Sequence, residues 1–432
     1  MKKFLACLLV LCLAFVPFIF AGCEAVNSIT LEGGPASEDE IFGNGGFVVK
    51  KGDYIYYASG FVQTSDLGTG GLTNNLGDVE NGALYRAKVE YQTEGTQGEE
   101  GFSQKMVINN SELLLSKLVG FNNSGLYIFG DKIYFGTPAT TKDNSGNVEY
   151  SMITFYSMDL NGQNLKSFYQ TTEFNGGDYS FVKIDNNIYL ILNTGLNLLR
   201  IDLTGKVVTL ASEIQSAVIA NDTVFYTLKN EKSTDKVDLG TELFAKDIKS
   251  LEETKLFNED YLTIKLIKYE NDVLYYNRNV LLSAKSPSSE SYLYANTLEN
   301  DFFDGEIKLL NHSEITNFVE TINGLVYINN SKLYIKNMEV KQLSSSASSI
   351  LCADGDYVYY INSSAIYRVD VTASNPTGVK LSGSNTINSS YFDIDENFVY
   401  FFVKNSTTNN YETYSLDIKY LNESSITPTK IN

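Results

Sequence analysis

Aspartates recur at two fixed places along the chain, and carboxylates at fixed places are candidates for chemistry. One set follows a turn residue and precedes a short aromatic segment: Asp53, Asp131, Asp222, Asp272 and Asp356. The other set lies in a second recurring segment: Asp159, Asp202, Asp247, Asp370 and Asp417. Gathered carboxylates could bind calcium or act as an acid and base pair. A residue that recurs in five copies is better explained by a role within each copy, so we expect hydrogen bonds from turn amides.

The other side chains that could carry chemistry do not form a recognisable constellation. His312 is the single histidine, which excludes metal sites built on several imidazoles. Cys352 has no expected histidine partner, and we expect it to be a small buried apolar residue. The sequence has neither a Gly-x-Ser-x-Gly elbow nor a Walker-type phosphate loop. It therefore predicts no catalytic residue, no metal site and no cofactor.

The elements that carry these aspartates form a repeat of eight copies. Each copy contains a turn pair followed by a short aromatic strand, at Gly52–Tyr56, Gly130–Tyr134, Asp185–Tyr189, Asn221–Phe225, Asn271–Tyr275, Asn323–Tyr327, Gly355–Tyr359 and Glu396–Tyr400. The final aromatic residues are separated by 78, 55, 36, 50, 52, 32 and 41 positions, a mean of about 49. Gly-Asp, Asn-Asp and Asn-Gly pairs suit hairpin turns that need positive φ. The pattern is typical of a repeat architecture.

A second segment of alternating apolar and polar residues completes each copy, as in Leu198–Gly205 and Ile366–Val371. An inner strand such as Phe181–Ile184 precedes the turn, and an outer strand such as Lys206–Leu210 follows the second segment. Four antiparallel strands per copy describe the blade of a β-propeller. The sequence predicts an all-β propeller of eight blades, with seven blades as the alternative.

The phrases Ile-Tyr-Tyr and Leu-Tyr-Arg-x-Asp-Leu-x-Gly resemble the blade pattern of low-density-lipoprotein-receptor-like β-propellers in bacterial surface lipoproteins of unknown function. The resemblance covers nearly all of the chain after its first segment. The animal receptors carry a Tyr-Trp-Thr-Asp motif, whereas this chain has no tryptophan. The resemblance therefore implies the scaffold and no particular ligand.

The N-terminal segment reads as an export signal. Lys2 and Lys3 precede an uncharged stretch of 17 residues, Phe4 to Phe20, which is followed by Ala21-Gly22-Cys23. This end resembles the bacterial lipobox, in which the cysteine is lipidated; an uncleaved membrane helix is the alternative. We expect a signal peptide at 1–22, a flexible acidic tether at 23–46 and one propeller domain at 47–432. The chain would then be extracytoplasmic and anchored to the bacterial cell membrane through Cys23.

Charge limits the partners. Removing the signal leaves a net charge of (33 − 2) − 52 = −21, since the removed piece holds two lysines and no acidic residue. So acidic a chain is repelled by nucleic-acid phosphates and by anionic lipid. We expect no nucleic-acid partner, and we expect a monomer whose link to the membrane is its lipid anchor.

The connections between the second and third strands differ in length from copy to copy. They are long at Ser59–Ala83, Gly136–Glu149, Lys229–Thr241, Asn277–Ser291 and Lys404–Glu412, in copies 1, 2, 4, 5 and 8. In a propeller these connections share one face, and insertions on one face often mark a binding side; tolerated slack is the alternative. Four aromatic or charged residues of the insertions are candidate ligand contacts: Phe61, Asp78, Asp143 and Arg278.

Three functions follow from these observations. The leading hypothesis is a non-enzymatic binding or scaffold lipoprotein that presents its long-loop face to an extracellular protein or glycan. The second is a carbohydrate-active hydrolase or lyase that uses two loop carboxylates. The third is a structural factor that assembles other envelope proteins. A close pair of carboxylates around a deep central pocket would favour the enzyme.

Overall fold

The computed structural model describes most of the chain after residue 44. The described residues are 45–62, 81–96, 102–121, 125–142, 148–172, 178–234, 237–283, 286–298, 302, 305–311, 314–383, 385–395, 398–418 and 428–431. The predicted signal, residues 23–44 of the predicted tether with Cys23, and Asp78, Asp143 and His312 lie outside these ranges.

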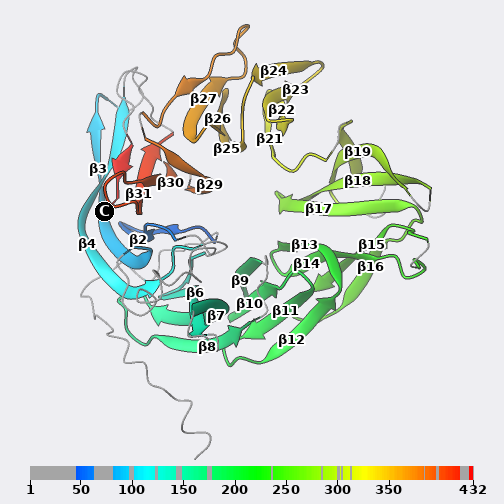
Figure 1. Ribbon diagram of the computed structural model, residues 1–432, viewed down its shortest axis with the longest axis horizontal. Helices are drawn as coiled ribbons and strands as arrows, with labels where there is room; N and C mark the ends of the chain where they lie inside the picture. Colours follow the sequence, from blue (N-terminus) through cyan, green and yellow to red (C-terminus); the bar gives the residue numbers. More distant parts are fainter. Residues whose placement is uncertain are drawn as a thin grey trace, which may run out of the picture.

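The described residues form eight four-stranded antiparallel sheets arranged as a ring (Figure 1). Blades 1 to 4 comprise β1 (Val48–Lys51), β2 (Tyr54–Ser59), β3 (Ala83–Glu94) and β4 (Ser103–Leu118); β5 (Tyr127–Phe129), β6 (Lys132–Lys142), β7 (Val148–Asp159) and β8 (Lys166–Thr171); β9 (Asp178–Ile184), β10 (Asn187–Asn193), β11 (Asn197–Asp202) and β12 (Val207–Ser212); β13 (Ile214–Ala220), β14 (Thr223–Lys229), β15 (Thr241–Asp247) and β16 (Glu253–Phe257).

Blades 5 to 8 comprise β17 (Leu262–Glu270), β18 (Val273–Ser283), β19 (Ser286–Asn296) and β20 (Glu306–Leu310); β21 (Phe318–Thr321), β22 (Gly324–Asn329), β23 (Lys332–Lys336) and β24 (Val340–Ser344); β25 (Ser349–Asp354), β26 (Tyr357–Asn362), β27 (Ala365–Asp370) and β28 (Val379–Lys380); β29 (Ile387–Ile394), β30 (Phe398–Lys404), β31 (Tyr411–Asp417) and β32 (Thr429–Lys430). The first strand of each blade lies toward the centre of the ring (Figure 1). The prediction of an eight-bladed propeller is confirmed.

In blades 1 to 5 and 7 the turn pairs lie where the sequence places them, between the first and second strands, whereas in blade 6 the turn is residues 322–323 and Gly324 begins β22. Gly52, Gly130, Asn221, Asn271 and Gly355 all have positive φ, between 52° and 63°. Such turns close two-residue hairpins because their twist matches that of the flanking strands.

An aromatic pair between the second and third strands is the common feature of the blades. In seven of the eight blades the two rings stack, with centroids 5.5 to 6.2 Å apart: Tyr57–Tyr85, Phe135–Tyr156, Tyr226–Phe244, Tyr276–Tyr294, Tyr327–Tyr334, Tyr360–Tyr367 and Phe401–Tyr414. In blade 3 the cross-strand pair Leu192–Leu199 stands at this place. Offset stacking of cross-strand neighbours stabilises a sheet beyond the burial of its area.

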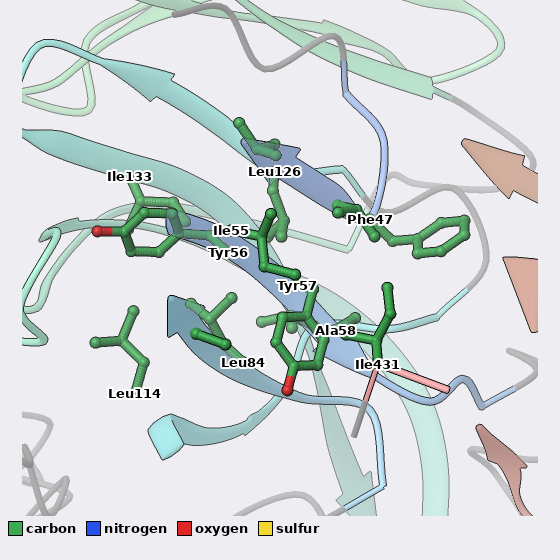
Figure 2. Packing of buried hydrophobic residues seen from close by; sticks show 14 of the residues in the cluster. Phe47, Ile55, Tyr56, Tyr57, Ala58, Leu84, Leu114, Leu126, Ile133 and Ile431 are labelled. Atoms are coloured by element: carbon green, nitrogen blue, oxygen red, sulfur yellow. The ribbon is translucent and has the colours of Figure 1, made fainter. Parts of the chain in front are cut away.

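Each blade also packs against both of its neighbours. Buried clusters join every pair of successive blades, and one cluster unites blade 1 with blade 2 and with blade 8. Figure 2 shows this cluster, in which Leu126 and Ile133 of blade 2 and Ile431 from the end of the chain surround Ile55 to Ala58 of β2. Both faces of β2 are therefore in the core, which explains why its apolar residues run consecutively.

The junction of blade 8 with blade 1, which we call the seam, closes the ring without strand exchange. Each sheet takes its four strands from one continuous segment, so side chains must join the two ends. The hydroxyl of Thr413 donates to the Ala58 carbonyl (2.7 Å) and accepts from the Gly60 amide (2.9 Å). All three groups are buried, so these bonds are made in place of bonds to water.

Aromatic rings and one carboxylate complete the seam. Phe61 stacks on Tyr391 at 4.4 Å, and Phe47 stacks on Phe402 at 4.1 Å. The Val48 amide donates to Asp393 Oδ2 at 3.1 Å. The seam therefore combines apolar burial with directional bonds that fix the register of the two blades.

Loss of a ring at a blade interface should cost much of the stability. Tyr359 is 1% exposed, and its hydroxyl donates to the Ile418 carbonyl of blade 8 at 2.7 Å. We expect Tyr359→Ala to lower the free energy of unfolding by about 3–5 kcal/mol, and Tyr359→Phe by about 1 kcal/mol because only the bond is lost. Urea titration measures both; equal effects of the two variants would contradict a packing role for the ring.

The Thr413 bridge gives a second expectation. Thr413→Val keeps the shape but removes both bonds of the hydroxyl, while the Ala58 carbonyl and the Gly60 amide keep their bond to each other at 3.0 Å. We expect a loss of about 1–3 kcal/mol in the free energy of unfolding. Thr209→Val, on an exposed strand position, is the control and should stay within about 0.5 kcal/mol of the parent. An unchanged melting temperature for Thr413→Val would show that the seam does not depend on this hydroxyl.

Candidate functional site

One face of the ring, which we call the hairpin face, carries the second-to-third-strand connections and the connections between blades. In blades 2 and 5 the predicted loops are wrong in form: they are extensions of β6 and β7 and of β18 and β19, paired as long hairpins. Blades 6 and 7 instead have two-residue turns, where Asn329 pairs with Lys332 and Asn362 with Ala365. Strand pairing stiffens the hairpins and projects them beyond the short turns.

The long connection of blade 4 is held by its own polar side chains. Asn230 is buried, and its side chain accepts from the Lys232 amide at 2.9 Å and donates to Asp260 at 3.2 Å. Ser233 Oγ accepts from the Leu239 amide at 2.9 Å. The connection therefore has a defined shape.

Blade 8 uses the same device. Asn405 Oδ1 accepts from the amides of Thr407 and Thr408 at 2.8 and 3.1 Å, and its Nδ2 donates to Glu412 at 2.8 Å. Two of the long connections are thus preorganised, which favours a binding surface over tolerated slack.

Two of the predicted contact residues can be placed, and they lie far apart in the chain and in different blades. Phe61 is 3% exposed in the seam, where its ring packs on Tyr391 and Phe402. Its position is structural, and a contact with a ligand stays a prediction.

Arg278 lies within β18 rather than in a loop. Its guanidinium donates to both carboxylate oxygens of Glu306 at 2.8 and 2.6 Å and to the Tyr294 hydroxyl at 2.6 Å. It also lies over the Tyr294 ring, 4.0 Å from the centroid. The Arg278 guanidinium therefore connects the second, third and fourth strands of blade 5.

Three recurring aspartates of the second segment, Asp202, Asp247 and Asp370, accept turn amides as the sequence predicts, whereas Asp159 accepts from the side chains of Lys132 and Asn164. Asp202 accepts from the hydroxyl and amide of Thr204 and from the Lys206 amide, and these bonds lower the pKa of its carboxyl. Asp370 accepts from the hydroxyl and amide of Thr372, with the same effect on its pKa. These carboxylates are occupied by the turns between the third and fourth strands.

The first-segment aspartates differ from the prediction. The carboxylate of Asp53 pairs with Lys88 at 3.1 Å, and that of Asp356 accepts from Asn323 Nδ2 at 2.8 Å. Their backbone carbonyls, rather than their side chains, receive amides: those of Val89 and Val371. The turn amides need no side-chain acceptor because the two-residue hairpin pairs them with backbone carbonyls.

A cavity of about 400 Å³ lies among the inner strands of blades 2 to 5. Tyr127, Asp178, Tyr179 and Ser180 line one side, and Ala217–Ile219 and Ile267–Tyr269 line the other. The Tyr179 hydroxyl is already bonded, to the backbone of Gly125 and Gly136. Nothing in the sequence indicated this site, because it is lined by inner strands from four successive blades.

Asp178 supplies the one carboxylate among the described residues that line the cavity. Asp178 has exposed area, yet the surrounding protein desolvates its carboxyl and raises the pKa of that group. The ammonium of Lys268 is engaged with Glu270 at 2.5 Å. One carboxylate does not make the acid and base pair that glycoside hydrolysis uses.

Within the part of the chain that the structure describes, no three histidine, cysteine or acidic side chains gather as metal ligands. Over the same residues, no helix is long and apolar enough to cross a membrane.

Cys352 is half-buried in β25, and desolvation raises the pKa of its thiol to about 12. The reactive species is the thiolate. We therefore expect native protein to react slowly with a thiol reagent at pH 8 and urea-unfolded protein to react at the rate of a free cysteine. Equal rates in the two states would contradict the buried position.

No known protein family matches the sequence, and no curated protein does. Solved structures match over much of the ring. A chain of a nidogen/laminin complex is 13% identical, with a TM-score of 0.31 over 56% of this chain and 92% of that chain. The β-propeller domain of the Trilobed protease from Pyrococcus furiosus, described as having an open velcro topology, is 11% identical, with a TM-score of 0.37 over 82% and 96%.

Enzymes are also among the similar structures. Oligogalacturonate lyase from Vibrio parahaemolyticus is 13% identical, with a TM-score of 0.38 over 77% of this chain and 98% of that chain. One of two prolyl endopeptidases is 11% identical, with a TM-score of 0.43 over 70% of this chain and 47% of that chain. This chain therefore spans about half of that protein. Similarity at this level concerns the propeller fold alone, which is shared by binding proteins and enzymes.

Proposed function

We propose that this chain is a non-enzymatic binding or scaffold propeller, exported and anchored to the cell membrane through lipidated Cys23. Its hairpin face is the surface offered to an extracellular protein or glycan. The observation that carries the proposal is that the connections on this face differ in length from blade to blade and are held in defined shapes. Long paired hairpins project from blades 2 and 5 and self-bonded connections from blades 4 and 8, whereas blades 6 and 7 end in two-residue turns.

Two further observations favour binding over hydrolysis. The second-segment aspartates Asp202 and Asp370 are consumed by their turns, and their pKa values are lowered rather than raised. The central cavity offers one carboxylate, Asp178, among its described lining residues. A two-carboxylate mechanism needs a second carboxyl group about 5–9.5 Å away.

Removing the two hairpins should remove binding and leave the fold. Pro138 pairs with Ile153 and Asn279 with Ser291, so 139–152 and 280–290 can each be replaced by Asn-Gly. Loop length changes stability by only about 0.6 kcal/mol per doubling. We expect the shortened 24–432 chain to lose the signals that the parent gives on an array of purified surface glycans and envelope proteins, with little change in melting temperature.

A matched control shortens the hairpin between β3 and β4 on the opposite face. Tyr91 pairs with Met106, so Asn-Gly can replace 92–105 and leave the stack of Tyr91 on Phe398 in place. This control should bind like the parent. If the control lost binding and the doubly shortened chain kept it, the opposite face would be the binding surface.

The anchor has its own test. Cys23→Ala should move the protein from the membrane fraction to the soluble fraction with an unchanged melting temperature, because the lipid is attached outside the propeller. Fractionation and mass spectrometry measure this. A membrane-bound Cys23→Ala protein without lipid would instead show that residues 4–20 form an uncleaved anchor.

A further inference from the structure

The place where the chain enters the ring is fixed by the backbone. Gly45 to Phe47 lead into β1, and the Phe47 carbonyl accepts from the Ala58 amide at 2.9 Å. The Gly46 carbonyl accepts from the Leu126 amide of blade 2 at 2.8 Å. Since β1 and β2 are antiparallel, the start of β1 lies beside the end of β2, where the second-to-third-strand connection begins. The chain therefore enters on the hairpin face.

The segment is closely packed against its neighbours. A Cβ on Gly46 would stand 1.9 Å from Asp393 Oδ2, and one on Gly45 would stand 2.2 Å from the Tyr127 hydroxyl. Gly45 has a φ of +85° and lines the central cavity. The tether thus meets the propeller near the ring axis, wedged between blades 2 and 8, and not at the outer rim.

The length of the tether then limits how the propeller can sit. Residues 24–44 make 44 − 24 + 1 = 21 residues between the lipidated cysteine and Gly45. The sequence predicts a flexible tether there, and a flexible chain of that length has a root-mean-square extension of about 25 Å. A domain of this size has a radius of gyration of about 21 Å. If the opposite face were turned to the membrane, the path from the axis to the rim and then down the side of the ring would be longer than that extension.

We propose that the hairpin face is turned toward the membrane that anchors the chain, so that what the hairpins bind is held at that membrane. This inference rests on the anchoring in the proposed function and deepens it. A net charge of −21 after processing opposes insertion of the hairpins into anionic lipid. The surface therefore suits a membrane-held protein rather than the lipid itself, and partners free in solution reach the opposite face.

Two exposed glutamates of blade 4 give a matched pair of probe positions. Glu231 lies in the second-to-third-strand connection on the hairpin face, and Glu252 lies in the third-to-fourth-strand connection on the opposite face. Glu231→Cys and Glu252→Cys, each in a Cys352→Ala background, remove the same charge. Each is labelled with one fluorophore and bound to phosphatidylcholine vesicles that contain headgroup spin-labelled lipid.

The attachment is made in two ways. One arm uses the full mature chain lipidated at Cys23. The other uses residues 24–432 with an N-terminal polyhistidine segment on nickel-chelating lipid, which tests the geometry even where lipidation fails. We expect the Glu231 probe to be quenched severalfold more than the Glu252 probe in both arms, and the difference to shrink when a long Gly/Ser segment is inserted after residue 30.

Equal quenching at the two positions, or stronger quenching at Glu252, in the nickel arm would overturn the inference. Failure of the lipidated arm to bind vesicles, with the expected difference in the nickel arm, would refute the anchor in the proposed function and leave the geometry standing. Loss of array binding on hairpin removal is independent of both results.

Discussion

The seam between the first and eighth blades is the constraint on which the other blades depend. Each blade is built from one continuous segment, so no strand crosses the junction. The Thr413 hydroxyl between Ala58 and Gly60, together with the stacks of Phe61 on Tyr391 and Phe47 on Phe402, has to supply what a shared strand would supply. If the seam opened, the apolar faces of blades 1 and 8 would meet water, and every other interface would lose its geometric closure.

Burial of both faces of each blade explains the composition of the chain and the different roles of its strands and connections. Because each blade is sandwiched, the second strands are apolar on both faces, and stacked Tyr and Phe pairs fill the space in a protein without tryptophan. The polar side chains of the repeat form local hydrogen bonds. Asp202 and Asp370, for example, accept amides of their own turns. What varies among blades is left to the hairpin face, where the chain also enters through Gly45 and Gly46. The projecting hairpins and the point where the chain enters the ring therefore lie on the same face.

The fold could be predicted because its signals are local and repeated eight times: turn pairs, alternating strands and recurring aspartates. The site could not be predicted to the same degree because it depends on contacts between segments that no local pattern links. Phe61 reads as an aromatic residue of an insertion, yet the seam covers it. The sequence suggests that Arg278 is a loop residue, yet it lies within β18, and its guanidinium forms an ion pair with Glu306. The cavity around Asp178 draws on four inner strands that no local pattern links.

Deletion of the eighth blade tests the closed ring most directly. A chain ending at residue 386 lacks β29 to β32 and exposes the partners of Phe398, Tyr400, Phe402 and Ile431 in the core of blade 1. Size-exclusion chromatography with light scattering, followed by thermal unfolding, is the measurement. The closed ring predicts an aggregated or protease-sensitive product with no cooperative transition at the temperature of the parent. A monomeric truncated chain with the parent's melting temperature would contradict it.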